Sequence, residues 1–241
     1  MIIQHNISAI NSYRNLGINQ SALSKNLEKL SSGYKINRAG DNAAGLAISE
    51  SMRSQINGLN QASANAKDAI GLIKTAEGAL SEVHSMLQRM TTLAEQAANG
   101  TYNTVARGNI QEEYKALTKE IKRISENADF NGIKPLTTGK EMTMTFQIGP
   151  TSGETITVDK EDIYGKTVTA AMSLKLSVQN DAKNALKTIK TAIDDVSTYR
   201  AKLGAAQNRL EHTVKSLDIM SENITEAESR IRDTDMADEI T

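Results

Sequence analysis

The stretch that decides the fold runs from Met52 to Ala98 and reads MRSQINGLNQASANAKDAIGLIKTAEGALSEVHSMLQRMTTLAEQAA. Every seventh residue from Met52 is apolar, and a second row, three places further on, is apolar everywhere except at Gln55. The two rows are Met52, Leu59, Ala66, Ile73, Leu80, Leu87 and Ala94, and Gln55, Ala62, Ala69, Ala76, Val83, Met90 and Ala97. This seven-residue repeat predicts a long helix with one coiled-coil-like seam.

The C-terminal part of the chain repeats the pattern. Its two rows are Ala182, Ile189, Val196, Leu203, Leu210, Leu217, Ile224 and Ile231, and Ala185, Ala192, Tyr199, Ala206, Thr213, Met220 and Ala227. Two helices of matching length can share one seam, and each would run about 75 to 80 Å at 1.5 Å per residue. We therefore expect a mainly α fold, an elongated rod of long antiparallel coiled-coil-like helices.

Composition supports this class and excludes others. Aromatic residues make up only 3% of the 241 residues, which suits thin helical seams better than a thick globular core. The formal charge of -1 gives no reason to expect nucleic acid as a partner, and no apolar run is long enough to cross a membrane. The absence of cysteine excludes disulfides and thiolate chemistry. The first residues lack the features of a cleaved signal peptide, and none is expected.

Shorter elements follow the first long helix. Apolar residues spaced three and four apart predict a helix over about 104–128; they are Ile110, Tyr114, Leu117, Ile121 and Ile124. Alternation around Met144 and Phe146, then a glycine-rich turn at 149–153, predicts a small β-hairpin over about 142–158. A lone hairpin is marginal, so we expect it to pack on the helices. The segment from 159 to 176 reads as a loop with one short turn of helix.

The N-terminal segment, 1–32, is a separate amphipathic helix with no evident partner in the chain. Its apolar residues are Ile3, Ile7, Ile10, Leu16, Leu23, Leu27 and Leu30, with a slip in register near Arg14. The segment that follows, SSGYKINRAGDNAAG at 31–45, carries three glycines between two helices. We expect Gly33 and Gly40 to let the backbone leave the helix, and Asp41 or Asn42 to cap the next one.

The residues of catalytic and metal sites are not grouped in this sequence. The three histidines, His5, His84 and His212, have no second ligand at a metal-binding spacing. No nucleophile-elbow or phosphate-loop motif occurs. An enzyme site near the hairpin would have to rely on carboxylates between residues 140 and 176 without any histidine. We expect no enzyme activity, no cofactor and no metal.

Several long stretches resemble bacterial flagellin. They are MIIQHNISAINS at the start, the segment from Ser31 to Leu80, LQRMTTLAEQAANGT, ISENADFNGIKPL, and the tail from Tyr199 to Thr241. The chain is similar to a short type that lacks the variable outer domains. The resemblance implies three parts: a filament-core helix at 1–32, a connector at 33–45, and a rod domain at 46–241 with helices over about 46–98, 104–128 and 178–232.

The resemblance also implies a function. It is that of a structural subunit of the flagellar filament, extracellular, exported through the flagellar secretion channel and used for motility. Implied partners are other copies of itself, the export apparatus and its chaperone, and the filament cap and hook-junction proteins. The residues it implies for assembly are Ile3, Ile7, Ile10, Leu23, Leu27, Arg38 and Asp41. We expect Arg38 and Asp41 to hold the connector in one shape.

The end of the sequence departs from the family pattern. Flagellins of this kind continue into a last helix that packs against the N-terminal helix, whereas this sequence stops at Thr241. We expect a form trimmed at its C-terminus and impaired in polymerisation.

A second implied role is recognition by the flagellin-sensing Toll-like receptor. The matching residues are Gln88, Arg89, Leu93 and Glu113, with Arg89 as the central charged contact, Leu93 as its apolar neighbour and Glu113 as the acidic companion. Thr91 and Thr92 depart from the charged pair of strongly stimulating relatives. The main alternative function is a non-filament helical adaptor of the secretion apparatus, which would not need the connector.

Overall fold

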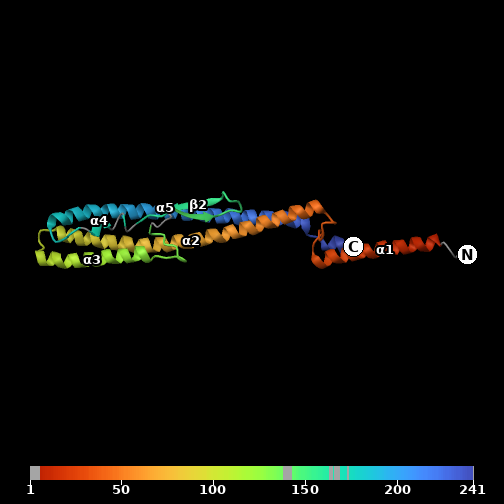
Figure 1. The fold of residues 1–241 in the computed structure, drawn as a ribbon, viewed down its shortest axis with the longest axis horizontal. Helices are drawn as coiled ribbons and strands as arrows, with labels where there is room; N and C mark the ends of the chain where they lie inside the picture. The colour runs from red at the N-terminus through yellow and green to blue at the C-terminus, as the bar shows by residue number, and fades with distance from the viewer. Residues whose placement is uncertain (1–5, 138–142, 163–164, 166–168, 173, 241) are drawn as a thin grey trace. The chain divides into compact units, whose positions relative to one another are not determined.

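The computed structural model describes residues 6–137, 143–162, 165, 169–172 and 174–240 (Figure 1). In chain order the elements are α1 (Ile7–Ser32), α2 (Ala43–Ala98), α3 (Thr104–Asn127), β1 (Thr143–Gln147), β2 (Thr155–Asp159), α4 (Thr169–Met172), α5 (Gln179–Arg232) and α6 (Met236–Ile240). The predicted class, mainly α with long helices and one small hairpin, is confirmed.

Contacts divide the chain into two compact units. The first contains residues 1–60 and 218–241, and the second contains residues 61–217. Helices α2 and α5 each contribute residues to both units, and the first unit is built from two separate segments of the chain. The expected division into a core helix, a connector and a rod remains a prediction.

The seam forms the core of the second unit. Both apolar rows are buried throughout from Ala62 to Ala97 on α2 and from Ala182 to Leu210 on α5. The many alanines in the second row of α2 leave room for a close approach, and Leu and Met side chains fill the remaining space. The predicted shared seam is therefore confirmed in this unit.

Helix α3 and the hairpin complete the same core. Asn103 caps α3 by accepting a hydrogen bond from the Ala106 amide at 2.8 Å, and Figure 1 shows α3 beside α2. In the hairpin, Met144 lies opposite Val158, and both are buried in the core with the helices. Packing on the helices, as expected, supplies the apolar surface that a lone hairpin lacks.

The first unit is much less buried. The seam is only half-buried at Met52 and Ile224, and Met220 is 44% exposed, so the predicted seam is not a full core over its whole length. Helix α1 has no buried residue. Helix α6 was not predicted; the Asp235 carboxylate at its start accepts from the Ala237 amide at 2.9 Å. It contacts α1 through Lys29 and Glu239, whose charged atoms lie 3.0 Å apart.

Candidate functional site

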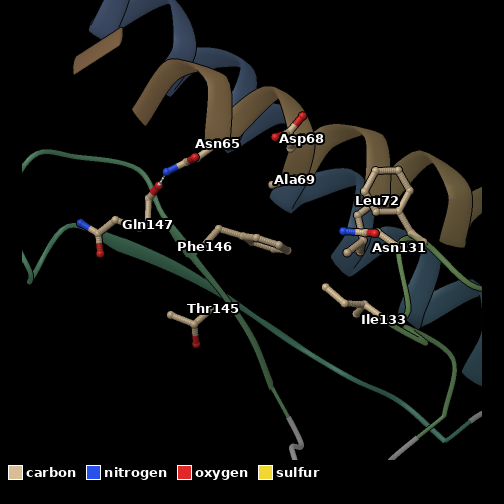
Figure 2. Close-up of a pocket in the computed structure, with 10 residues that line it drawn as sticks. Asn65, Asp68, Ala69, Leu72, Asn131, Ile133, Thr145, Phe146 and Gln147 are labelled. Atoms are coloured by element: carbon tan, nitrogen blue, oxygen red, sulfur yellow. Dashed lines mark hydrogen bonds between the residues drawn. The ribbon is translucent and has the colours of Figure 1, made fainter. Parts of the chain in front are cut away.

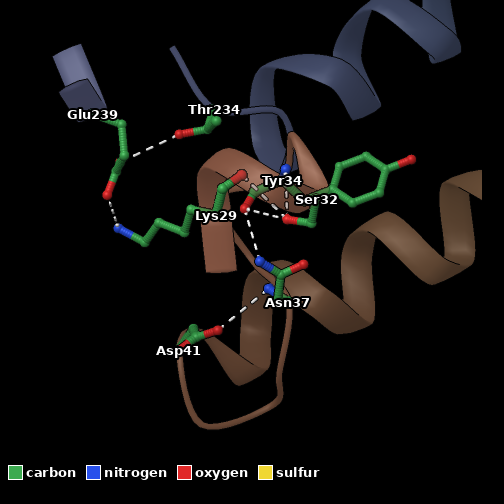
Figure 3. Close-up of polar contacts among 7 residues, drawn as sticks. All are labelled: Lys29, Ser32, Tyr34, Asn37, Asp41, Thr234 and Glu239. Carbon is green, nitrogen blue, oxygen red and sulfur yellow. Dashed lines mark hydrogen bonds and ion pairs between the residues drawn. The ribbon is translucent and has the colours of Figure 1, made fainter. Parts of the chain in front are cut away.

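The connector between α1 and α2 has a defined shape set by local hydrogen bonds (Figure 3). Gly33 ends α1 in the left-handed region with φ 74°, and its amide donates to the Lys29 carbonyl at 2.8 Å. Asn42 caps α2, since its Oδ1 accepts from the Gly45 amide at 2.9 Å. Gly40 does not have a positive φ. The reversal predicted for two glycines is thus carried by Gly33, and the predicted cap by Asn42.

Asp41 and Arg38 both make contacts in the connector, but with different partners. The Asp41 carboxylate accepts from the backbone amides of Asn37 at 3.3 Å and Arg38 at 3.0 Å. The bond from the Arg38 amide is the main cause that lowers the pKa of Asp41. The Arg38 guanidinium instead donates to Glu28 at 2.9 Å. Asp41 therefore fixes the turn through the backbone, while Arg38 links the turn to α1.

A cluster that the sequence did not indicate joins the connector to α2 and α5. Two guanidinium groups lie over the Tyr34 ring, with Arg232 4.8 Å and Arg53 5.4 Å from its centroid. Arg53 also donates to the Tyr34 hydroxyl at 3.1 Å and to Glu228 at 3.1 Å. Arg232 donates to Glu50 at 2.7 Å. We call these five residues the Tyr34 clasp.

Main-chain bonds run beside the clasp. The Lys35 amide donates to the Arg232 carbonyl at 2.6 Å, and the Thr234 amide donates to the Gly33 carbonyl at 3.0 Å. The cation–π contacts, the ion pairs and these main-chain bonds together tie the connector to α2 and to the end of α5.

The expected assembly residues on α1 are exposed. Ile7 is 68% and Leu23 is 60% exposed, and Ile10 and Leu27 are similarly open, whereas Ile3 lies outside the described residues. A helix turns by about 100° per residue. Ile7 and Ile10 therefore lie on one side of α1, and Leu23 and Leu27 on nearly the opposite side. The predicted slip in register leaves this one helix with two apolar stripes.

The residues expected to contact a receptor occupy one surface of the second unit, with one exception. The Arg89 Nε donates to Glu113 at 2.8 Å, which joins α2 to α3, and both side chains are about half exposed. Gln88 is exposed and lies 3.1 Å from the His84 ring. Leu93 is only 1% exposed and belongs to the core. Leu93 as a surface contact is therefore corrected: it supports the surface from beneath.

The described residues were also searched for a metal site and for a membrane-spanning helix. Among the described residues, no group of three or more His, Cys, Asp or Glu side chains could hold a metal ion. Within the same residues, no helix has the length and apolar character needed to cross a membrane. Burial raises the pKa of Tyr114 and of Tyr199 to about 12, so both phenols stay protonated to a higher pH than a free tyrosine does.

Known proteins identify the family. Residues 3–141 match the bacterial flagellin N-terminal helical region, and residues 186–241 match the bacterial flagellin C-terminal helical region. The chain belongs to the bacterial flagellin family. A flagellin of Halalkalibacterium halodurans is 49% identical over all of this chain and 88% of its own length. A flagellin of Bacillus subtilis is 47% identical over all of this chain and 90% of its own length.

Solved structures agree with this flagellin assignment. The crystal structure of Bacillus cereus flagellin is 32% identical, covers 64% of this chain and 88% of its own, and has a TM-score of 0.59. A putative flagellar hook-associated protein from Vibrio parahaemolyticus has a TM-score of 0.67 over 80% of this chain and all of its own. At 12% identity, this second likeness shows the fold alone.

Proposed function

We propose that the chain is a structural subunit of the bacterial flagellar filament and acts outside the cell in motility. The observation that carries the proposal is the exposed apolar surface of α1, which a monomer would leave in water. A protein at 44% identity is a flagellar filament core protein in Treponema maltophilum. Flagellins are a structural family, in keeping with the absence of catalytic motifs from the sequence.

The two stripes on α1 suggest how subunits join. Stripes on opposite sides of one helix cannot be covered by a single helix, so two different neighbours are needed. A filament provides this, because each subunit offers one surface to a different surface of the next and the contact does not close. In this proposal Ile7 and Ile10 meet one neighbour, and Leu23 and Leu27 meet another.

The connector sets the direction in which α1 leaves the rest of the chain. Asp41, Arg38 and the Tyr34 clasp hold that segment, so their role in assembly is to fix its shape. A helical adaptor of the secretion apparatus would not require such a fixed link to an uncovered helix. This difference favours the filament subunit over the adaptor.

Export and accessory partners follow from the family. We propose that the chain passes unfolded through the flagellar export channel, is held by a chaperone before export, and meets the cap and hook-junction proteins during assembly.

Recognition by the flagellin-sensing Toll-like receptor is a second proposed function. Arg89 is exposed and paired with Glu113, the neighbouring Gln88 is also exposed, and arginine is common among interface hot spots. Its pairing with Glu113 fixes the guanidinium before binding, which reduces the entropy that binding costs. Leu93 contributes by supporting α2 from the core.

Electron microscopy tests the filament role. Two double variants each remove one stripe and leave the second unit unchanged: Ile7→Ser with Ile10→Ser, and Leu23→Ser with Leu27→Ser. Both variants are made in a chain extended after Thr241 by a flagellin-type amphipathic helix, and each is expected to lose the filaments that this extended chain forms. Normal filaments from either variant would mean that the stripe it lacks is not an assembly contact.

A further inference from the structure

The outer edge of β1 has unpaired main-chain groups. The Ile148 amide donates to the Glu154 carbonyl at 2.9 Å, which makes these two residues a hydrogen-bonded pair in the antiparallel register. Such pairs alternate along the ladder. The amides and carbonyls of Thr143, Thr145 and Gln147 therefore point away from β2. The Gln147 carbonyl accepts a hydrogen bond from Asn65 at 3.2 Å, whereas Thr145 has no partner on this edge among the residues that the structure describes.

The open edge borders a groove. Two adjoining hollows of about 510 and 440 Å³ share Leu72, Ile133, Thr145 and Phe146 among their walls. Figure 2 shows the Phe146 and Ile133 side chains reaching into the space between β1 and the 130–133 turn, below α2. Ile133 is 42% exposed. Unpaired main-chain groups beside an apolar floor are the features that bind an added strand.

The turn on the other side of the groove is rigid. Phe130 and Ile133 exchange two main-chain hydrogen bonds of 3.0 Å across Asn131 and Gly132, both of which have a positive φ. Asp129 also accepts from the Gly132 amide at 2.7 Å. The groove is therefore bounded on both sides by ordered main chain, which lowers the cost of ordering on binding.

Charges differ between the two ends of the groove. Asp68 lines the hollow next to Gln147, whereas Lys134 and Lys160 line the hollow next to Thr143. A strand that pairs antiparallel with β1 starts at the Gln147 end and finishes at the Thr143 end. Charge complementarity then favours a basic residue first and an acidic residue last.

We propose that this groove binds an extended segment of a partner polypeptide as a third strand, antiparallel to β1. The segment carries a basic residue near Asp68, an apolar residue over Phe146 and Ile133, and an acidic residue near Lys134 and Lys160. Main-chain bonds to Thr145 give the strand its register, and the apolar floor selects its central side chain. The site lies within the second unit and does not depend on filament assembly.

Fluorescence anisotropy of a dye-labelled pentapeptide, Lys-Thr-Val-Thr-Glu, tests the proposal on the full chain. Saturable binding is expected, weakened at least tenfold when the central Val becomes Ser. Thr145→Pro removes the edge amide without touching a bond to β2, and should weaken binding about tenfold. Thr157→Pro is the matched control, since Thr157 faces the opposite edge of the same hairpin, and it should bind normally.

A second variant protects the test against misfolding. If Thr145→Pro loses the native circular dichroism, Ile133→Ser takes its place, because it removes exposed apolar surface without disturbing the strand. No saturable binding to the unmodified chain, or equal binding by Thr145→Pro and Thr157→Pro, would overturn the proposal. The proposal would also be overturned if the chain bound no peptide but self-associated, and Thr145→Pro abolished that self-association. In that case the groove would bind a second copy of the chain.

Discussion

The guanidinium of Arg232, in the last turn of α5, lies 4.8 Å from the ring centroid of Tyr34 in the connector. Nearly two hundred residues separate them in the sequence, yet this contact and the adjacent main-chain bond from the Lys35 amide to the Arg232 carbonyl tie the two segments together. The shape of the connector therefore depends on the end of α5 as well as on its own sequence.

Replacing Tyr34 should loosen the connector. Tyr34→Leu removes two cation–π contacts, each contributing about 0.5 to 1 kcal/mol at partly exposed sites. Hydrogen exchange at the Lys35 and Thr234 amides should speed up accordingly, by roughly five- to thirtyfold for about 1 to 2 kcal/mol. Tyr34→Phe keeps the ring and loses only the bond from Arg53, so its effect should be smaller. Unchanged exchange in Tyr34→Leu would show that the main-chain bonds suffice.

Arg89→Ala should weaken receptor binding by at least tenfold while leaving stability nearly unchanged. An interface arginine can contribute more than 1.4 kcal/mol, whereas its exposed pair with Glu113 adds only about 0 to 1 kcal/mol to folding. Surface plasmon resonance with the receptor ectodomain measures the first effect, and urea unfolding the second. Arg123→Ala is the control, because Arg123 is also exposed and paired with a glutamate on α3. Equal losses in both variants would argue against a specific contact.

Leu93→Ala should act through stability alone. Removing a buried leucine typically costs about 2 to 5 kcal/mol, so thermal unfolding should shift to lower temperature. Val105→Ala, at a 74% exposed position of α3, should change stability very little. Below its unfolding temperature Leu93→Ala should keep most receptor affinity. A large loss of affinity from a fully folded Leu93→Ala protein would restore Leu93 as a direct contact.

High pH should destabilise the second unit through two tyrosines. Burial raises the pKa of Tyr114 and of Tyr199 from 10.0 to about 12, so the folded state holds their protons more tightly than the unfolded state does. The two protonated tyrosines contribute fully to the free energy of unfolding below pH 10, and this contribution is lost as the pH rises toward 12. Tyr114→Phe and Tyr199→Phe should each flatten the fall in stability over that range. If both variants lost stability with rising pH just as the unmodified chain does, the buried tyrosines would not be the cause.

The long helices could be predicted because one physical rule repeats along them. A residue every seven places, such as Ile73 or Leu203, must face the same neighbour, and no distant information is needed. The same rule explains why the error at Leu93 was avoidable. Leu72, Ala79, Met86 and Leu93 form another seven-residue row beside the seam, and all four belong to or pack against the core that includes Tyr114 of α3.

Other features depend on distant residues and left little trace in the sequence. No sequence pattern links Tyr34, Arg53 and Arg232. They come into contact only because of where α2 begins and where α5 ends. Asp41 was expected to matter, but its partners are backbone amides, which no side-chain pattern shows. Helix α6 is short, and its one local signal, an aspartate at Asp235 before Met236, is common in turns as well as at helix caps.

The measurement that tests the central claim most directly is electron microscopy under salting-out conditions. It compares this chain with the same chain carrying a flagellin-type amphipathic helix after Thr241. Because the stripes of α1 are exposed, we predict long helical filaments from the extended chain and few or none from the chain alone. If neither forms filaments while both units remain folded, the filament role would be contradicted.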